Sequence, residues 1–251
     1  MTSNNNNTAN DSLKAGPLNN VLLDVLAQKS SWQLLGKSVQ RKACHCQNYH
    51  LDGRFIIKLF RFPENEILDN TWWIIEHTIL SLINGKWGSP ISHGYLSFNQ
   101  DTYNIVIFVR ERISGNTLEE SNVSILNNAQ CKEVGELLAN FHNDGIVTRD
   151  CTLGNLLLNT DNTLCFIDFG KARSYKNKTL LFFFQAGWDC WKAQWRCAKL
   201  EPRLCEIMMN AYWAKLDTNK YTRALYNLMQ KITRRQQLMR LKKRGKLPDY
   251  I

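Results

Sequence analysis

One segment near the middle of the sequence constrains the fold more than any other. Asp150 and Asn155 are followed by two short apolar runs, at 156–158 and 164–167, with polar residues between them. This pattern predicts two strands joined by a tight turn. Asp168 follows the second strand directly. Because a hairpin brings its two ends together, the sequence predicts that Asn155 and Asp168 lie side by side.

The residue types in this segment suit phosphoryl transfer. That chemistry needs a bound Mg²⁺, a carboxylate near the attacking hydroxyl and positive charge near the phosphates. Carboxylate and amide oxygens are the ligands that Mg²⁺ prefers, so Asn155 and Asp168 are the candidate metal ligands. Asp150 is the candidate catalytic residue, as the base or as the group that orients the hydroxyl. The alternative is a plain hairpin whose Asp, Asn and Gly residues only form turns.

The region before Asp150 is predicted to be helical. Apolar residues recur at helical spacing between residues 129 and 142, and Gly145 is a suitable end for that helix. A short loop then carries Asp150.

An upstream pair argues against the plain hairpin. Lys58 lies in a predicted strand at 54–60, and Glu76 lies eighteen residues later in a predicted helix at 71–83. The apolar stripe of that helix is expected to comprise Trp72, Ile75, Ile79, Leu82 and Ile83, with Glu76 at its edge. We expect Lys58 and Glu76 to form an ion pair that positions Lys58 on phosphates. Glu64 and Glu66 are alternatives, but they are expected to lie in a loop after Pro63.

A second predicted strand, at 103–109, is a strongly apolar run of β-forming residues and is expected to be central in its sheet.

Together these residues resemble the protein-kinase-like superfamily. The resemblance is carried by Arg149-Asp150, Asn155 and Asp168-Phe169-Gly170, with Lys58 and Glu76 upstream. Within the superfamily, the chain is most similar to the small bacterial lipopolysaccharide core kinases, which phosphorylate heptose or 3-deoxy-manno-octulosonic acid (Kdo) sugars. The span from Lys58 to the loop is short, and no Ala-Pro-Glu signature or long activation segment follows Gly170. The resemblance covers roughly residues 30–245.

The resemblance implies an α+β, two-lobed protein-kinase-like fold, with a small antiparallel-sheet N-lobe and a mostly helical C-lobe. The expected divisions are a disordered segment at 1–16, an N-lobe at 17–113, a C-lobe at 114–217 and a basic amphipathic tail at 218–251. The implied activity is transfer of a phosphoryl group from ATP, with Mg²⁺, to a sugar hydroxyl of the lipopolysaccharide inner core. The cofactor-binding residues would be Lys58 and Glu76, with adenine contacts near Glu111 and Ile113 in the link between the lobes.

Two features depart from the superfamily pattern. Thr148 stands where a His normally braces the catalytic loop. No Gly-rich loop precedes Lys58, because the stretch from Gly36 to Gly53 contains no other glycine. Basic residues in this stretch, such as Arg41 and Lys42, are the candidates to cover the phosphates instead.

Composition bears on location. The sequence has eight cysteines and no Cys-x-x-Cys pair, which argues against a zinc site. No signal peptide and no apolar run of about 18 residues is found in the sequence. Free thiols then predict the reducing cytoplasm.

The formal net charge of +10 is concentrated in the tail. Ten of the 32 Lys and Arg residues lie between 218 and 248, where no Asp or Glu occurs. The same stretch has an apolar stripe at helical spacing, formed by Tyr221, Leu225, Leu228, Met229 and Ile232. A basic amphipathic helix suits an anionic membrane surface, here the cytoplasmic face of the inner membrane. The alternative is a last helix packed on the C-lobe, with a solvated basic face. Few aromatic residues interleave with the charges, so nucleic acid is disfavoured as a partner. The oligomeric state leaves no signal in the sequence.

An aromatic-rich helix is predicted around Trp188, Trp191 and Trp195, either as core or as a sugar-stacking surface. Asp189 within it is a candidate to hold the backbone of the catalytic loop. Two other functions stay open at this point. One is a small atypical protein kinase of the RIO or Bud32 type, and the other is a membrane-associated nucleotide-binding pseudokinase.

Overall fold

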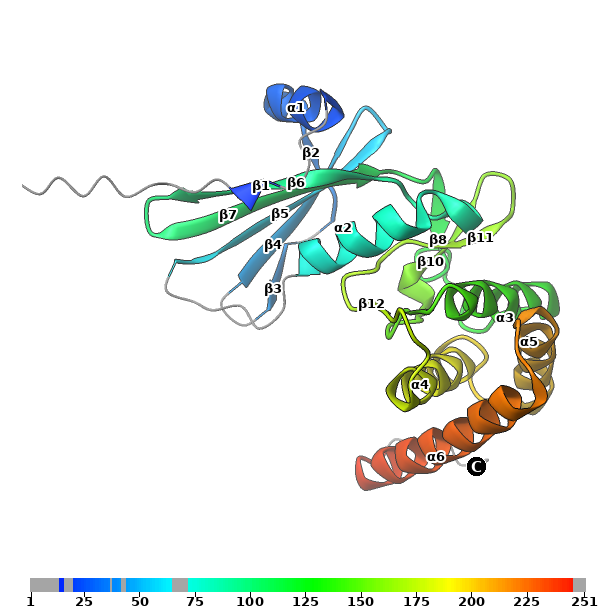
Figure 1. The fold of residues 1–251 in the computed structure, drawn as a ribbon. Helices are drawn as coiled ribbons and strands as arrows, with labels where there is room; N and C mark the ends of the chain where they lie inside the picture. Colours follow the sequence, from blue (N-terminus) through cyan, green and yellow to red (C-terminus); the bar gives the residue numbers. More distant parts are fainter. Residues whose placement is uncertain (1–13, 16–19, 37, 42–43, 65–71, 246–251) are drawn as a thin grey trace, which may run out of the picture. The chain divides into compact units, whose positions relative to one another are not determined.

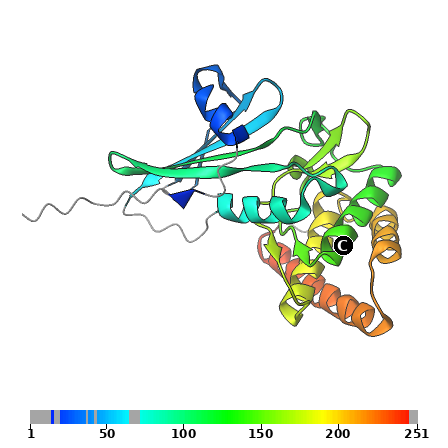
Figure 2. The same cartoon turned by 45° about the horizontal axis from the view of Figure 1, so that its top comes forward.

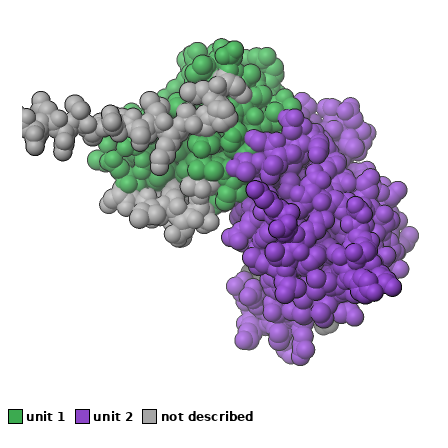
Figure 3. Space-filling model, viewed as in Figure 1, with its two compact units in different colours: residues 1–77, 90–112 green, residues 78–89, 113–251 purple. Residues whose placement is uncertain are grey.

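The computed structural model describes residues 14–15, 20–36, 38–41, 44–64 and 72–245. In this part of the chain the fold is mixed α+β, with an antiparallel sheet and six α-helices, as expected. The chain divides into two compact units, and each is described by itself (Figure 3). Unit 1 comprises residues 1–77 and 90–112, and unit 2 comprises residues 78–89 and 113–251.

Unit 1 is built on a seven-stranded antiparallel sheet (Figure 1). Its strands, in spatial order, are β1 (Lys14–Ala15), β6 (Ser92–Gln100), β7 (Tyr103–Glu111), β5 (Phe55–Pro63), β4 (Cys44–Leu51) and β2 (Gln33–Leu34), with β3 (Val39–Arg41) also paired to β4. The apolar strand β7 is central, as its sequence predicted. Most of the segment at 1–16 lies outside the described residues. Its two described residues, Lys14 and Ala15, form a strand instead of the expected disorder.

The two faces of this sheet pack against different helices, because successive side chains of a strand point to opposite sides. On one face, Ile57 clusters with Leu22 and Val25 of α1 (Asn20–Ala27), which is followed by the 3-10 turn η1 (Lys29–Ser31). On the other face, Phe60 and Phe62 of β5 stack against Trp73 of α2 (Trp72–Ile83), with ring centroids 5.2 and 5.8 Å apart. Lys58 shares the parity of Phe60 and so points toward the start of α2.

Helix α2 occupies the predicted segment, and its buried face is shifted relative to the predicted stripe. Ile79 and Ile83 of that stripe are buried as expected, Leu82 is exposed, and the buried face also contains Trp73, Glu76 and Leu80. Glu76 therefore lies in the middle of the buried face, and the prediction that it sits at the edge was wrong. The helix has apolar residues nearly all round, so periodicity alone did not identify the buried side.

Unit 2 is mostly helical. Helix α3 packs against α5, and α4 packs against α6; the second pair can be followed in Figure 2. The helices are α3 (Asn128–Asn143), α4 (Leu180–Arg196), α5 (Pro202–Lys215) and α6 (Lys220–Lys243), and the 3-10 turns are η2 (Lys86–Gly88) and η3 (Leu153–Asn155). The short strands are β8 (Gly115–Thr117), β9 (Ile146–Val147), β10 (Leu156–Asn159), β11 (Leu164–Phe166) and β12 (Arg173–Ser174). They form a β11–β10–β8 sheet and a β12–β9 pair.

Helix α3 has clear local signals at both ends. Asn127 and Gln130 form a reciprocal capping box at its start, each side chain accepting from the other's backbone N–H. Gly145 follows its end in the left-handed region, with φ of +71°, as predicted for a residue just past a helix. The chain can therefore turn sharply into β9 and the loop that carries Asp150.

The basic tail forms α6 and belongs to unit 2. A Cβ added to Gly187 of α4 would lie 3.2 Å from the backbone N of Gln230, so the two helices approach closely there. The buried face of α6 consists of Tyr226, Thr233, Gln237 and Leu241. The predicted apolar stripe is not the packed face, since Tyr221, Leu228 and Ile232 are exposed. No helix among the described residues is long and apolar enough to cross a membrane.

Candidate active site

The loop that carries Asp150 is held through its backbone by Asp189 of α4. Asp189 Oδ2 accepts from the N–H of Thr148, and Oδ1 accepts from the N–H of Arg149, both at 2.6 Å. Arg149 has φ of +60°, a conformation that costs a non-glycine residue about 1–3 kcal/mol unless its surroundings fix it. The predicted role of Asp189 as the brace of this loop is confirmed.

Asp189 is itself held in a buried polar network. His142 at the end of α3 lies between two groups, with Nε2 3.4 Å from Asp189 Oδ2 and Nδ1 2.7 Å from the hydroxyl of Tyr212. All three side chains are buried. Buried polar groups that satisfy one another act as a rigid unit, so the backbone of the loop is fixed from the interior of unit 2.

The predicted hairpin is present and brings Asn155 and Asp168 together. Strands β10 and β11 pair with Leu156 opposite Phe166, and the N–H of Ile167 donates to the carbonyl of Asn155 at 3.1 Å. Asp168 follows Ile167 directly, and its Oδ1 accepts from the N–H of Gly170 at 3.1 Å.

Asn155 also reaches back to the loop that carries Asp150. Its Nδ2 donates to the carbonyl of Asp150 at 2.8 Å, and its Oδ1 makes no hydrogen bond with the described residues. The three candidate residues of unit 2 are thus linked by backbone or side-chain bonds over a short stretch of chain.

Two lysines that sequence reasoning missed bind the Asp150 carboxylate. Lys171 Nζ donates to Oδ2 at 2.5 Å, and Lys192 of α4 donates to Oδ1. Burial alone would raise the pKa of the Asp150 carboxyl, but the hydrogen bonds and charges of the two lysines outweigh it, so the pKa lies below its ordinary value. One sequence signal existed: Lys192 comes three residues after Asp189 on the same predicted helix, which places both on one face.

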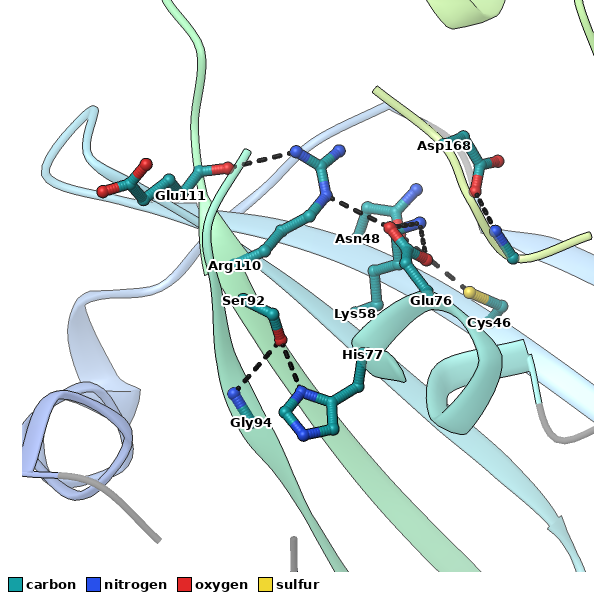
Figure 4. A network of polar contacts seen from close by, with 11 residues as sticks. Cys46, Asn48, Lys58, Glu76, His77, Ser92, Gly94, Arg110, Glu111 and Asp168 are labelled. Carbon is teal, nitrogen blue, oxygen red and sulfur yellow. Dashed lines mark hydrogen bonds and ion pairs between the residues drawn. The ribbon is translucent and has the colours of Figure 1, made fainter. Parts of the chain in front are cut away.

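The predicted ion pair between Lys58 and Glu76 is present in unit 1. Lys58 Nζ lies 2.6 and 2.9 Å from the two carboxylate oxygens (Figure 4). The sequence did not reveal a second cation, Arg110 of β7, whose Nε forms an ion pair with Glu76 Oε1 at 3.3 Å. Arg110 and Glu76 are buried and Lys58 is nearly so. The Glu76 carboxylate is therefore shared by two cations. Glu64, the alternative partner, binds Asn99 instead, and Glu66 lies outside the described residues.

Glu111 and Ile113, the two positions expected to contact adenine, differ in whether their backbone groups are already hydrogen-bonded. The backbone of Glu111 is already engaged: its N–H donates to the carbonyl of Ile91 at 2.8 Å, and its carbonyl accepts from Arg110 at 3.1 Å. Ile113 makes no hydrogen bond with the described part of the chain. Ile113 is therefore the better placed of the two to offer backbone groups to a base.

Two oxygen ligands from the chain suit Mg²⁺, which usually keeps water and phosphate oxygens in its remaining positions. Asn155 and Asp168 form such a pair, so the donor set fits a nucleotide-bound Mg²⁺. Among the described residues, no group of three or more His, Cys, Asp and Glu forms a metal site. The described residues therefore do not support a metal site made of protein ligands alone.

The segment that replaces a Gly-rich loop is the hairpin of β3 and β4. Lys42 and the side chain of Arg41 lie outside the described part, so their predicted contact with phosphates stays a prediction. All eight cysteines are free, as expected. Burial raises the pKa of Cys131 to about 12 and that of Cys205 to about 11, which keeps both thiols protonated at neutral pH.

Neither a protein-family model nor a curated protein matches this chain.

Proposed function

We propose that this chain is an ATP-dependent phosphotransferase with a protein-kinase-like fold, which phosphorylates a sugar hydroxyl of the lipopolysaccharide inner core. One observation carries the phosphotransferase part. Asn155 donates to the carbonyl of Asp150 and accepts from Ile167, the neighbour of Asp168, and Asp189 fixes the backbone beside them. Phosphoryl transfer needs little more than such positioning and charge.

In the proposed reaction, the acceptor hydroxyl oxygen attacks the γ-phosphorus of ATP. A new O–P bond forms, the bond from that phosphorus to the bridging oxygen breaks, and ADP leaves with the electron pair. Asp150 accepts a hydrogen bond from the hydroxyl and takes its proton. Because its pKa is lowered, Asp150 is a weak base that orients the hydroxyl and receives the proton late. Bound Mg²⁺, held by Asn155 and Asp168, would neutralise charge on the phosphates.

The buried cluster of Lys58, Glu76 and Arg110 supports binding of an anion by unit 1. Two cations lie together at one carboxylate there, and both can donate hydrogen bonds to an oxyanion. A phosphate oxygen of ATP is the anion that the proposal assigns to it. Charge-assisted hydrogen bonds of this kind are among the stronger ones in proteins.

Helix α6 supports an acceptor that lies at a membrane. Its outward side carries the apolar residues Tyr221, Leu228, Ile232 and Met239, all exposed. Between residues 220 and 244 the helix has nine Lys and Arg and no acidic residue. An exposed apolar stripe flanked by positive charge suits the anionic, amphiphilic surface from which a glycolipid would be presented. The opposite face of α6 packs on α4. The helix can therefore be packed on unit 2 and still offer its exposed side to a membrane surface.

The proposal is tested with purified chain, Mg-ATP and truncated core lipopolysaccharide. We expect phosphorylated glycolipid in mass spectra, and we expect Asp150→Ala to lower its rate by about 10²-fold or more. Asp161→Ala, in the exposed turn between β10 and β11, is the matched control and should retain the wild-type rate. Transfer by Asp150→Ala at the control rate contradicts the role of Asp150.

The acceptor is tested separately from the chemistry. Phosphate that appears only on protein substrates would replace the sugar acceptor with a protein. ATP binding without transfer to any acceptor would instead favour a nucleotide-binding scaffold.

A further inference from the structure

Both oxygens of the Asp150 carboxylate are occupied, and by lysines in different settings. Lys192 donates to Oδ1 and also to the carbonyl of Arg149, at 3.3 Å, and its side chain is 14% exposed. Lys171 donates to Oδ2, and its side chain is 47% exposed. One lysine is therefore part of the packed interior, and the other reaches in from the surface.

Lys192 belongs to the device that fixes the loop. Asp189 and Lys192 lie three residues apart in α4, on one face of the helix. Asp189 accepts from the backbone N–H groups of Thr148 and Arg149, while Lys192 donates to the Arg149 carbonyl and the Asp150 side chain. Helix α4 thus binds the N–H groups of the loop with an acidic side chain and the oxygen atoms of the loop with a basic one. Removal of the Lys192 side chain would leave the partly buried Asp150 carboxylate without its interior partner.

Lys171 is anchored less firmly. It lies directly after Asp168-Phe169-Gly170, and within the described part of the chain its side chain donates to Asp150 Oδ2 alone. An exposed lysine loses little when it exchanges one anionic partner for another, because its stem is flexible and water competes for its charge. Oδ2 is also the oxygen that an acceptor hydroxyl must reach, since Oδ1 is held by Lys192.

We propose that Lys192 is a positioning residue that fixes Oδ1 of Asp150, and that Lys171 is exchangeable. When a polyphosphate such as that of ATP binds, Lys171 turns from Oδ2 to an anionic oxygen of the phosphoryl group, and the acceptor hydroxyl then takes its place at Oδ2. The proposal rests on the proposed function for the identity of that group. It adds a positively charged group, which Asp150, Asn155 and Asp168 do not supply.

The exchange follows from charge. Asp150 with two lysines carries one net positive charge, which favours an incoming anion. When the hydroxyl takes Oδ2, Lys171 has moved by about the length of one hydrogen bond and stays close to the reacting atoms. A cation at that distance stabilises the negative charge spread over the phosphoryl oxygens.

Four variants test the proposal: Lys192→Met, Lys192→Arg, Lys171→Met and Lys171→Arg. Lys132→Met is the matched control, because Lys132 is an exposed lysine that pairs with a single carboxylate, Glu136. Equilibrium binding of Mg-ATP and of inorganic tripolyphosphate is measured by calorimetry, and circular dichroism checks folding. Turnover, the KM for each substrate and the pH profile are measured on truncated core lipopolysaccharide.

We expect Lys171→Met to weaken binding of tripolyphosphate and ATP about tenfold, as the loss of a charge-assisted hydrogen bond should, and Lys171→Arg to restore most of it. We expect Lys192→Met to lower kcat at least about tenfold with ATP affinity unchanged, and to shift the acid limb of the pH profile upward. Lys192→Arg, which keeps the charge, should recover part of kcat.

The outcomes separate this proposal from the proposed function. If the wild-type chain is active and all four variants have the same affinities, kcat and KM as Lys132→Met, the roles of the two lysines are overturned and the phosphotransferase proposal stands. A higher KM for lipopolysaccharide in Lys171→Met, with unchanged tripolyphosphate binding, would also overturn the proposal, because the anion would then belong to the acceptor. If the wild-type chain has no turnover, but Lys171→Met still weakens its binding of tripolyphosphate, the proposed function is refuted and the anion site is supported.

Discussion

At the scale of single residues, the candidate site depends on charges that sequence motifs do not contain. The predicted residues Glu76 and Asp150 each have a partner that spacing alone did not reveal. Glu76 is bound by Arg110 as well as Lys58, and Asp150 is bound by Lys171 and Lys192. Arg110 comes from β7, Lys192 from α4 and Lys171 from the turn after Gly170, so these partners are found only once the chain is folded.

Asp150 makes the stability of the protein depend on pH in a defined direction. Its pKa is lower in the folded chain than in the unfolded one, so its contribution is present above the unfolded value and is lost as pH falls through the folded value. We expect Asp150→Asn to be less stable than wild type at pH 7, because two lysines lose their shared anion. The difference should shrink below about pH 3.9, the ordinary value for Asp.

Urea unfolding of both proteins at pH 7 and in the acid range measures this difference. Asp161→Asn, in an exposed turn, serves as the control for loss of a negative charge. A gap between wild type and Asp150→Asn that widens on acidification would contradict the assigned shift.

At the scale of elements, close helix packing explains features of unit 2 that residue types alone leave open. A Cβ added to Gly135 of α3 would lie 2.1 Å from the carbonyl oxygen of Met208 in α5. No real Cβ contact is that short, so α3 and α5 meet backbone to backbone at this point. Glycine is required there by the neighbouring helix and not by its own conformation.

Gly135→Ala should therefore destabilise the protein, although alanine favours an isolated helix by about 1 kcal/mol over glycine. We expect a loss of about 2 kcal/mol or more in the free energy of unfolding, as for overpacked cores. Glu136→Ala, at the next position, removes only a surface ion pair and should change stability by less than about 1 kcal/mol. Denaturant titration of the two variants gives the comparison, and a more stable Gly135→Ala would refute the close contact.

The exposed side of α6 predicts binding to anionic lipid. Wild-type chain should co-sediment with phosphatidylglycerol-containing vesicles and be released by salt, since charge contributes. Arg234→Gln with Arg235→Gln should weaken binding by about tenfold or more, at roughly 1 kcal/mol for each charge. Leu228→Asn should weaken it as well, with little change in stability because that side chain is exposed. The matched control is Lys132→Met, on α3. Equal sedimentation with neutral phosphatidylcholine vesicles would contradict the electrostatic part.

At the scale of the whole molecule, the sequence predicted order and type of elements better than their orientation. The strand with Lys58, the hairpin between Asn155 and Asp168 and the helix before Gly145 were all predicted, because each has strong local signals. The buried face of α2 was predicted only in part, and that of α6 was not predicted. Both helices have apolar residues on more than one side, and only packing against the rest of the fold decides which side is buried.

The same reasoning explains what could be found of the site. Residues that bind one another within about twenty positions, or at the two ends of a hairpin, leave a spacing pattern. Lys192 and Arg110 act across tertiary contacts and leave none by themselves. The expected division after residue 113 was implied by the resemblance, whereas the assignment of residues 78–89 to unit 2 depends on tertiary contacts.

The hydrogen bonds from α4 to the loop that carries Asp150 bear on which residues that loop can contain. Asp189 holds Thr148 and Arg149 by their main chain, and main-chain atoms are the same whatever the side chain. Position 148 can thus exchange its residue for another that has a backbone N–H and fits the buried site of Thr148, while the loop keeps its geometry. A search for chains of this design should therefore not require a histidine before Arg149. It should look instead for an aspartate and a lysine three apart on one helix, beginning about 40 residues further along.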